Sequence, residues 1–474
     1  MNYTAPDVYI NDVVSGSNSI VQLSSSVGCL IGTTPSGPVG VPTKVTSWTE
    51  FVEKFANGLD TPFMANQYLS YSVYGFFQNG GSELYVLNIK KSGQKATATL
   101  ATSKLVCTAL YEGAWANGAK VTIEKNDAWT STNLVYDITV EFGDNTITVE
   151  EATFATALDM LNGNVQLSQW FVFSYAASAS ALDEENATLS GGSEGNTLAD
   201  ADYVNSLTKL DILEDITLVG IPGQTSSTVN DALILYCTEH EEFPMLDMPM
   251  ASTVDATKAY RKTLDAFTGA LTYPWGKVND PLTGTLKLVP SVGHAMGVYS
   301  RTIDSESVAK APAGVNAVVR GFVELEKQLS ATEIGILNPL GVICITARSN
   351  SGIVIWGARS LNSSDKTMRY VTDGLLNLNI KRSLYAGTQF AVFERNDEKL
   401  WGRIDTACRA FLENLRLQGC LKGTAEEAYF VVVNSTNNTP QSIENGYLNI
   451  DIGYAPVKPA EFVVIRLAHS IVSE

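Results

Sequence analysis

The C-terminal part of the chain carries the clearest pattern of apolar and polar residues. Between 400 and 415 apolar residues recur every three or four positions, which predicts an amphipathic helix that ends at Gly419. The apolar run over 428–433 and the alternation over 446–452 predict two strands. After two prolines, alternation resumes at Phe462 and predicts an extended terminal strand.

The region before this domain has the pattern of an α/β core that is interrupted by a β-rich insertion. Apolar runs at 27–32 and 84–89 predict buried strands with two helices between them, the order that a parallel crossover requires. Short strand-like segments over 93–175, followed by a linker rich in Ala, Ser and Gly, predict a β-sandwich insertion. Strand and helix signals alternate again over 199–361.

These patterns place the chain among multidomain proteins with α/β and β parts. We expect an N-terminal extended arm (1–25), the first part of the α/β core (26–92), the β-sandwich insertion and linker (93–198), the rest of the α/β core (199–364), an α+β C-terminal domain (365–460) and a C-terminal strand arm (461–474).

Neither arm contains enough apolar area to fold alone. An extended apolar segment at a chain end needs a sheet to join, in its own subunit or in a neighbour. If a neighbour supplies that sheet, the residues that enter it are Ile20, Val21, Leu23, Phe462, Val464, Ile465 and Leu467.

The charge and cysteine content exclude several classes of protein. With 50 acidic and 32 basic residues the formal net charge is −18, which argues against direct contact with nucleic acid. The excess of acidic residues serves solubility, complements a basic partner surface or causes self-repulsion in an assembly, and the sequence does not separate these alternatives. No run of 18 apolar residues and no basic leader followed by an apolar segment is present, so we expect neither membrane insertion nor a secretory address. The six scattered cysteines predict reduced core thiols.

The sequence offers little for catalysis. Residues 191–195 match G-x-S-x-G, but Ser193 lies in the linker and not between a strand and a helix. A Ser-His-Asp arrangement would have to use His240 or His294, and we interpret both as surface or capping histidines. Metal-ligand spacings and phosphate-binding loops are missing as well. We therefore expect no catalytic, cofactor-binding or metal-binding residues.

Six segments along nearly the whole chain resemble contractile tail sheath proteins, the family that forms the outer sleeve of phage tails and of related bacteriocin or injection particles. They are APDVY (5–9), GFFQNGG (75–81), KAPAG (310–314), LNPLG (337–341), GIVIWGAR (352–359) and GYAPVKPAEF (453–462). The last two are the most specific of these segments.

The resemblance implies a subtilisin-like α/β domain without protease activity, a β-sandwich insertion and a C-terminal domain that carries the connections between subunits. In such sheaths the terminal arms add strands to the C-terminal domain of a neighbour. The resemblance also implies that a helix of that domain lines the inner tube. We place this helix at 374–385, with Arg369, Lys381 and Arg382 as candidate tube contacts, although a helix-end and surface role is the alternative for these residues.

The expected function is therefore that of a structural subunit that forms stacked hexameric rings around a tail tube and contracts to drive the tube through an envelope. Expected partners are further copies of the chain, the inner tail tube protein, and baseplate and tail terminator proteins. A divergent subtilisin-like hydrolase and a monomeric binding module are the alternatives. The sequence leaves open whether the particle is a phage or a DNA-free bacteriocin. Synthesis in the bacterial cytoplasm is expected in both cases.

Overall fold

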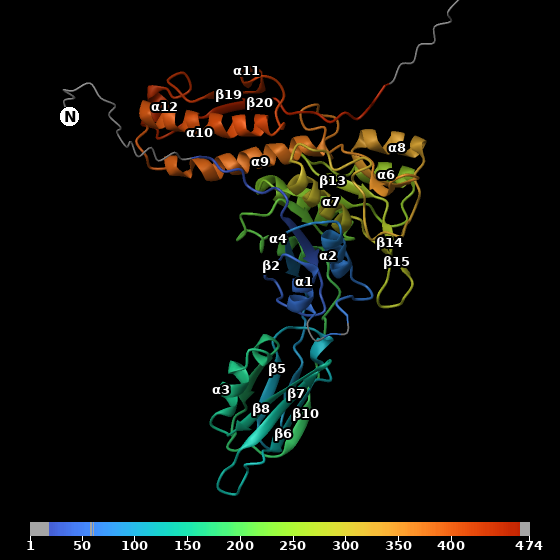
Figure 1. Cartoon of the computed structure of the whole chain (residues 1–474), viewed down its shortest axis with the longest axis vertical. Helices are drawn as coiled ribbons and strands as arrows, with labels where there is room; N and C mark the ends of the chain where they lie inside the picture. The colour runs from blue at the N-terminus through green and yellow to red at the C-terminus, as the bar shows by residue number, and fades with distance from the viewer. Residues whose placement is uncertain (1–18, 57–58, 60, 465–474) are drawn as a thin grey trace, which may run out of the picture. The chain divides into compact units, whose positions relative to one another are not determined.

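The computed structural model describes residues 19–56, 59 and 61–464. The contacts within the chain divide these residues into two units, which are described separately. Residues 24–375 and 459–464 form the larger unit, and residues 19–23 and 376–458 form the smaller unit. Figure 1 shows the chain and labels many of its helices and strands. The division into two arms and four further regions that the sequence suggests, with its bounds, stays a prediction.

The larger unit is built on an eight-stranded sheet in the order β18-β17-β13-β12-β11-β1-β3-β2. Its strands are β1 (Gly28–Gly32), β2 (Thr43–Val45), β3 (Leu84–Asn88), β11 (Leu218–Gly220), β12 (Phe243–Asp247), β13 (Ala270–Tyr273), β17 (Val342–Arg348) and β18 (Gly352–Ile355). The six inner strands pair in parallel, and β2 and β18 run antiparallel at the edges. The crossover predicted between 27–32 and 84–89 is confirmed by the parallel pairing of β1 with β3.

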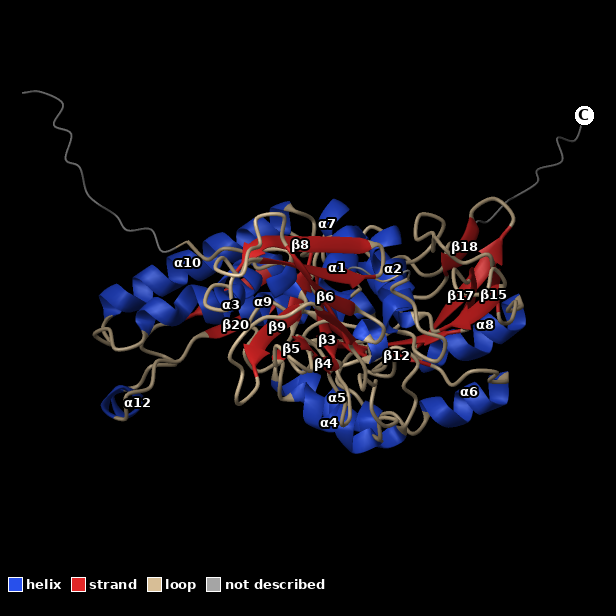
Figure 2. Cartoon of the chain, turned by 90° about the horizontal axis from the view of Figure 1, so that it is seen from below, coloured by secondary structure: helices blue, strands red, loops and turns tan. Residues whose placement is uncertain are grey.

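Helices cover both faces of this sheet (Figure 2). They are α1 (Trp48–Phe55), α2 (Leu69–Gln78), α4 (Asp200–Leu207), α5 (Ser227–Glu239), α6 (Val254–Arg261), α7 (Val292–Ser305) and α8 (Ala331–Leu337). Cys29 and Ile31 of β1 share a buried cluster with Leu233 of α5. A Cβ at Gly28 would instead lie 2.8 Å from Met296 of α7, so that α5 and α7 pack on opposite faces. A small sheet of β14 (Gly276–Asn279), β15 (Leu286–Val289) and β16 (Glu324–Leu325) completes this part.

The insertion consists of two antiparallel sheets that share one apolar core. One sheet contains β4 (Thr97–Thr99), β5 (Leu105–Ala109) and β9 (Phe171–Tyr175). The other contains β6 (Lys120–Lys125), β7 (Tyr136–Phe142), β8 (Asn145–Ala152) and β10 (Glu185–Thr188), and α3 (Ala157–Gly163) accompanies them. Cys107 of β5, Ile138 of β7 and Phe171 of β9 belong to the same buried cluster. Period-two burial along β7 explains why the sequence signal for strands was strong here.

A buried lysine joins the insertion to the α/β core. The side chain of Lys90, which follows β3, is 0% exposed. Its Nζ donates to Glu194 Oε2 at 2.5 Å, to the Glu112 carbonyl at 2.8 Å and to the Pro35 carbonyl at 3.2 Å. Burial lowers the pKa of Lys90, although the pairing with Glu194 opposes that shift. One ammonium group thus connects the loop after β1 to two segments of the insertion, at Glu112 and Glu194.

Replacing Lys90 with Met is expected to lower the free energy of unfolding by about 1–3 kcal/mol, because three acceptors lose their donor and the methionine keeps the volume of the aliphatic stem. The chain segments at the insertion should also become more sensitive to limited proteolysis. Urea unfolding and proteolysis would measure both effects. Lys95→Met, at an exposed lysine of the same region, is the matched control and should change neither. Equal behaviour of the two variants would contradict this role for Lys90.

The smaller unit pairs two long helices with a two-stranded sheet. Its elements are α9 (Val371–Thr388, from Leu376 onward), α10 (Glu398–Leu417), α11 (Ala425–Ala428), β19 (Tyr429–Val432), α12 (Pro440–Glu444) and β20 (Asp451–Tyr454). The apolar stripe predicted over 400–415 is confirmed, since its members on α10 are buried. Asp397 caps this helix by accepting from the Leu400 N–H at 2.9 Å. Gly419 follows it with φ +78, as a helix-ending glycine requires.

The predicted strand over 446–452 is wrong in its bounds, because β20 begins only at Asp451. An asparagine network holds the preceding backbone in another conformation. Asn437 and Asn438 donate their side-chain amides to the Asn449 carbonyl at 3.1 and 2.9 Å. Asn438 Oδ1 accepts from the Asn449 N–H at 2.7 Å. These local side-chain bonds compete with a strand ladder and delay the strand by several residues.

Candidate functional site at the roots of the terminal arms

The root of the C-terminal arm is a carboxylate held by three side chains within the larger unit. Nε and Nη2 of Arg359 donate to the two oxygens of Glu461, each at 2.8 Å. Asn338 Nδ2 donates to Oε1 at 2.5 Å and the Tyr370 hydroxyl donates to Oε2 at 3.0 Å. The side chains of Glu461 and Arg359 are 16% and 15% exposed. A bidentate pair with this little exposure is among the stronger ion pairs in proteins.

The protonation of Glu461 follows from these contacts. Burial raises the pKa of its carboxyl, but the hydrogen bonds from Arg359, Asn338 and Tyr370 outweigh burial and hold that pKa below its ordinary value. The site therefore contains a charged carboxylate at neutral pH.

Three of the segments on which the family resemblance rests meet at Glu461. Asn338 belongs to LNPLG, Arg359 ends GIVIWGAR, and Glu461 is the penultimate residue of GYAPVKPAEF. Asn338 begins the short helix that precedes β17, and Arg359 follows β18, so adjacent strands position both donors. No spacing in the sequence links these residues, so this cluster was not among the sites predicted from the sequence.

The residues just beyond Glu461 are apolar and exposed. Phe462, Val463 and Val464 expose 75%, 80% and 77% of their surface and are not part of a strand. Consecutive exposed apolar residues of this kind are uncommon on the surface of a single folded chain. Ile465 and Leu467 lie outside the described residues.

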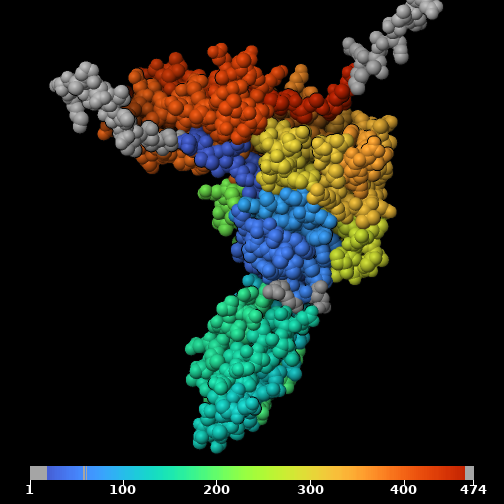
Figure 3. Space-filling view, viewed as in Figure 1, coloured from blue at the N-terminus to red at the C-terminus, as the bar shows by residue number. Residues whose placement is uncertain are grey.

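The root of the N-terminal arm packs on its own chain, within the smaller unit. Ile20 is 8% exposed, and a Cβ at Gly387 of α9 would lie 2.6 Å from its side chain, so this close contact requires a glycine. The Leu23 N–H donates to Ser383 Oγ at 3.0 Å, and Asn379 Nδ2 donates to the Leu23 carbonyl at 2.7 Å. The segment runs along α9 (Figure 3). It is extended without being a strand, and Val21 remains 70% exposed.

The sheet of the smaller unit has only two strands among the described residues. β19 and β20 pair antiparallel from Tyr429 opposite Tyr454 to Val432 opposite Asp451. On β19, the Val431 side chain is buried and its carbonyl accepts from Arg409 of α10 at 2.6 Å. Phe430 is 55% exposed. In a sheet this small both strands are edge strands, the geometry to which further strands add.

The candidate tube contacts belong to two different units. Lys381 and Arg382 lie side by side on α9 in the smaller unit, the lysine exposed and the arginine half-buried. Arg369 belongs to the larger unit and donates to the Ser363 carbonyl at 3.3 Å. The structure thus keeps Lys381 and Arg382 together and assigns Arg369 a contact within its own loop.

The candidates for catalysis have structural surroundings. The backbone of Ser193 pairs with Gln94, and the next helix begins only at Asp200. The interpretation of His294 as a surface or capping residue is wrong, since it is 1% exposed on α7. His240 follows α5 and stacks on Tyr236 with ring centroids 4.1 Å apart. His469 lies outside the described residues.

The part of the chain that the structure describes contains no group of three His, Cys, Asp or Glu residues that could hold a metal ion. Over the same residues, no helix is both long enough and apolar enough to cross a membrane. All six cysteines are buried, which confirms their prediction as core residues.

Comparison with known proteins gives the class of the chain. The family described as "Phage tail sheath protein central domain" matches residues 196–361, and "Phage tail sheath C-terminal domain" matches residues 363–469. The chain belongs to the phage tail sheath protein family, which confirms the resemblance seen in the sequence. Members of this family are structural sheath proteins, so the comparison speaks against the hydrolase alternative.

Individual relatives agree with this family. The chain is 23% identical over 253 residues to the tail sheath protein of Escherichia phage P2, and the match covers 52% of this chain and 62% of that protein. The chain therefore spans less than two thirds of the length of that curated relative. Its fold is similar to the helical sheath of the anti-feeding prophage in the contracted state, with a TM-score of 0.64, 22% identity and 99% and 100% of the two chains covered. A sheath tail protein from Desulfitobacterium hafniense gives a TM-score of 0.64 at 14% identity, with 90% and 93% covered.

Proposed function

We propose that this chain is the repeating subunit of a contractile sheath that forms stacked hexameric rings around an inner tube. The sheath contracts from a metastable extended state and drives the tube through a target envelope, for genome ejection by a phage or for killing by a bacteriocin-like particle. The observation that carries the proposal is the exposed apolar segment beyond Glu461 in a chain whose smaller unit has a sheet with two edge strands.

The two features complement each other in chemistry. An edge strand offers N–H and C=O groups, and an extended segment such as Phe462–Val464 supplies both backbone partners and apolar side chains. Each added backbone hydrogen bond contributes about 0.5–1.5 kcal/mol net, and each buried aliphatic or aromatic side chain contributes about 1.5–3 kcal/mol. A few residues thus make a connection of useful strength between neighbouring subunits. Ile20, Val21 and Leu23 are the corresponding residues of the other arm, although Ile20 and Leu23 already contact α9 of their own chain.

The Glu461 cluster gives this connection a mechanical anchor. An arm that transmits force between subunits must not slide at its root. Arg359, Asn338 and Tyr370 fix the carboxylate immediately before the exposed segment. We infer that the C-terminal arm pulls on the larger unit through this cluster when neighbouring subunits rearrange. Such work needs no nucleotide, because its energy is stored in the extended lattice.

The finer features of the family are part of the same proposal. We infer that the eight-stranded unit is a subtilisin-like core and that the two sheets of the insertion are its β-sandwich, and the parallel strand order and the shared core support both inferences. The expected partners are the tube protein, baseplate and tail terminator proteins, with no direct contact to nucleic acid and no membrane insertion. The chain would be made in the host cytoplasm and act in the particle.

Reversing the charges of Lys381 and Arg382 to Glu tests the proposed tube contact. Growth of sheath on the tube is expected to fall at least tenfold, because attraction to an acidic tube surface becomes repulsion. Electron microscopy of wild-type chain and tube should show sheathed tubes, and counting them measures the effect. Lys95→Glu together with Lys209→Glu makes the same charge change at exposed lysines of the larger unit and should leave growth intact. Normal growth of the α9 variant would exclude the contact, and absence of any ordered assembly by the wild-type chain would exclude the function.

A further inference from the structure

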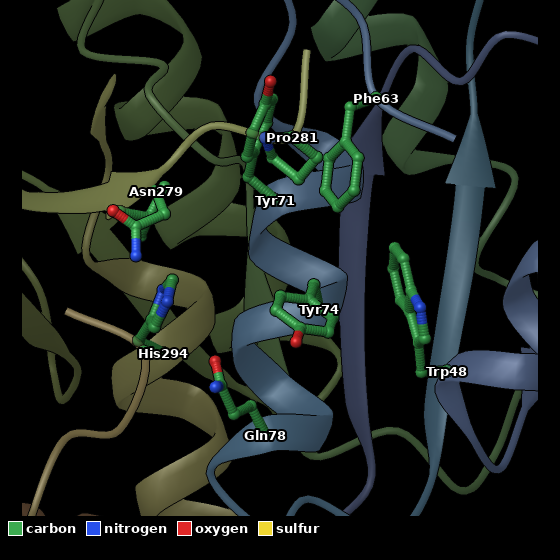
Figure 4. A pocket seen from close by; sticks show the side chains of 10 residues that line it. Trp48, Phe63, Tyr71, Tyr74, Gln78, Asn279, Pro281 and His294 are labelled. Atoms are coloured by element: carbon green, nitrogen blue, oxygen red, sulfur yellow. The ribbon is translucent and has the colours of Figure 1, made fainter. Parts of the chain in front are cut away.

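A pocket in the larger unit has one wall made entirely of aromatic rings. Trp48 of α1 lies 5.5 Å from Phe63 and 4.9 Å from Tyr74 of α2, and Phe63 lies 4.6 Å from Tyr71, between ring centroids. Rings this close leave no room between them, so they form one continuous surface. The pocket has a volume of about 360 Å³ and opens between this wall and residues of β14 and α7. Figure 4 shows the rings together with His294, Gln78 and Asn279.

His294 supplies the polar part of the opposite side. It lines the pocket, is 1% exposed, and neither of its ring nitrogens has a hydrogen-bond partner among the described residues. One face of the imidazole packs on Phe322 at 4.1 Å between centroids. A Cβ at Gly75 would lie 2.4 Å from the ring, and one at Gly321 would lie 3.3 Å from Nε2. Two glycines therefore make space for an imidazole whose nitrogens are unused by the fold, although buried polar atoms are normally paired.

The pocket offers hydrogen bonds without charge. Burial lowers the pKa of His294 to about 3, so the ring is neutral and presents one N–H donor and one nitrogen acceptor. The Tyr71 hydroxyl is already engaged, since it donates to Asp280 at 2.7 Å and accepts from Lys287 at 3.1 Å. The amides of Gln78 and Asn279, the Tyr74 hydroxyl and the Trp48 indole N–H are the other polar side-chain groups of the lining residues. A charged ligand would find no counter-charge among these groups.

We propose that this pocket binds a free, uncharged, planar heteroaromatic molecule that packs against the wall of Trp48, Phe63 and Tyr74 and donates a hydrogen bond to the acceptor nitrogen of His294. The volume suits a single ring system with small substituents, at the lower end of small-molecule sites. The inference goes beyond the proposed function, because a sheath subunit needs no small ligand to assemble. The ligand would bridge α1, α2 and α7 and stabilise their packing.

Indole and indene test the proposal, because they share one bicyclic shape and differ in the N–H donor. Isothermal titration calorimetry on the full chain is expected to give an indole Kd below roughly 1 mM, the range open to a fragment of this size. Indene should bind at least tenfold more weakly, since it leaves His294 unpaired. Indole binding should be equal at pH 5 and pH 8 because the imidazole stays neutral. Tyr74→Ala, which removes a half-exposed ring of the wall, should weaken indole at least tenfold.

Tyr447→Ala is the matched control, since this tyrosine is 64% exposed and lies in the smaller unit, away from the pocket. It should leave indole binding unchanged. His294→Phe should remove the preference for indole over indene, and its thermal unfolding would report whether the fold survives. Failure of indole to saturate the wild-type chain, or equal binding by the Tyr74 and Tyr447 variants, would overturn the proposal. Equal affinity for indole and indene would remove the hydrogen bond to His294 and with it the proposed ligand class. Each outcome is independent of whether the chain forms sheaths.

Discussion

Deleting residues 462–474 is expected to yield a folded chain that forms no sheath. The cut removes the exposed segment that we propose to pair with a neighbour, and it spares Glu461 with its contacts to Arg359 and Asn338. Loss of several backbone hydrogen bonds and of three apolar side chains at every subunit contact multiplies along a lattice. Size-exclusion chromatography should show a monomer, circular dichroism should show a wild-type fold, and electron microscopy should show neither tubes nor rings.

The matched deletion removes residues 1–23, and with them Ile20, Val21 and Leu23 of the N-terminal arm. It is also expected to prevent polymerisation. Because this cut also removes the contacts of Ile20 and Leu23 with α9, thermal unfolding should show that the shortened chain remains folded. Normal sheaths from either deletion would contradict the arm argument. A deletion chain that unfolds would point to a role within the subunit.

Replacing Asp247 with Ala is expected to lower the free energy of unfolding by about 3 kcal/mol or more. Asp247 ends β12 and is 1% exposed. Its carboxylate accepts from the backbone N–H groups of Ser291 and Val292, at 3.0 and 2.9 Å, and of Gly223, at 3.0 Å. Alanine leaves two buried donors, of Ser291 and Val292, and the part-buried donor of Gly223 without an acceptor, and each buried donor is worth about 1–3 kcal/mol. Thermal or urea unfolding measures the loss, and Asp255→Ala, at an exposed aspartate of α6, should cost less than about 1 kcal/mol.

The contribution of Asp247 to the free energy of unfolding should depend on pH. Burial raises the pKa of Asp247 to about 6, although its hydrogen bonds oppose the shift. A folded pKa above the unfolded value means that the protonated group favours the fold. The contribution of Asp247 to stability is therefore complete below the unfolded pKa near 4 and decreases as the pH rises through about 6. The difference between wild type and Asp247→Asn should follow this trend, and a difference that is constant from pH 4 to pH 7 would contradict it.

Asp247 also shows how the structure separates a catalytic arrangement from a structural one. The Ser291 hydroxyl is buried and contacts Thr272 Oγ1 at 2.9 Å and Asp247 at 3.4 Å. Ser291, which precedes α7, and Asp247, which ends β12, are thus adjacent in space. His294, on the same helix, lines the aromatic pocket instead, and no residue that the structure describes pairs with its ring nitrogens. Residue types alone permit a hydrolase here, whereas the contacts show an aspartate that anchors a helix.

Sequence periodicity was most informative where burial is periodic along one element. The stripe of α10 and the alternation of β7 could be predicted because each buries one face against a single core. The start of β20 could not be predicted in this way. The side chains of Asn437 and Asn438 hydrogen-bond to the backbone of Asn449, which is farther along the chain than a local pattern of apolar and polar residues extends. His294 was misplaced for a similar reason, since its burial depends on Gly75 and Gly321 from other segments.

The sequence by itself determined the family, the α/β core and the apolar character of both arms. Short characteristic segments and the spacing of apolar residues depend only on residues that are close together along the chain. Only the tertiary structure decided that LNPLG, GIVIWGAR and GYAPVKPAEF meet at one carboxylate, that Ile20 is covered by α9, and that four aromatic rings face a neutral histidine. The physical reason is that hydrogen bonds and packing contacts join residues more than a hundred positions apart, where spacing in the sequence carries no information about proximity in space.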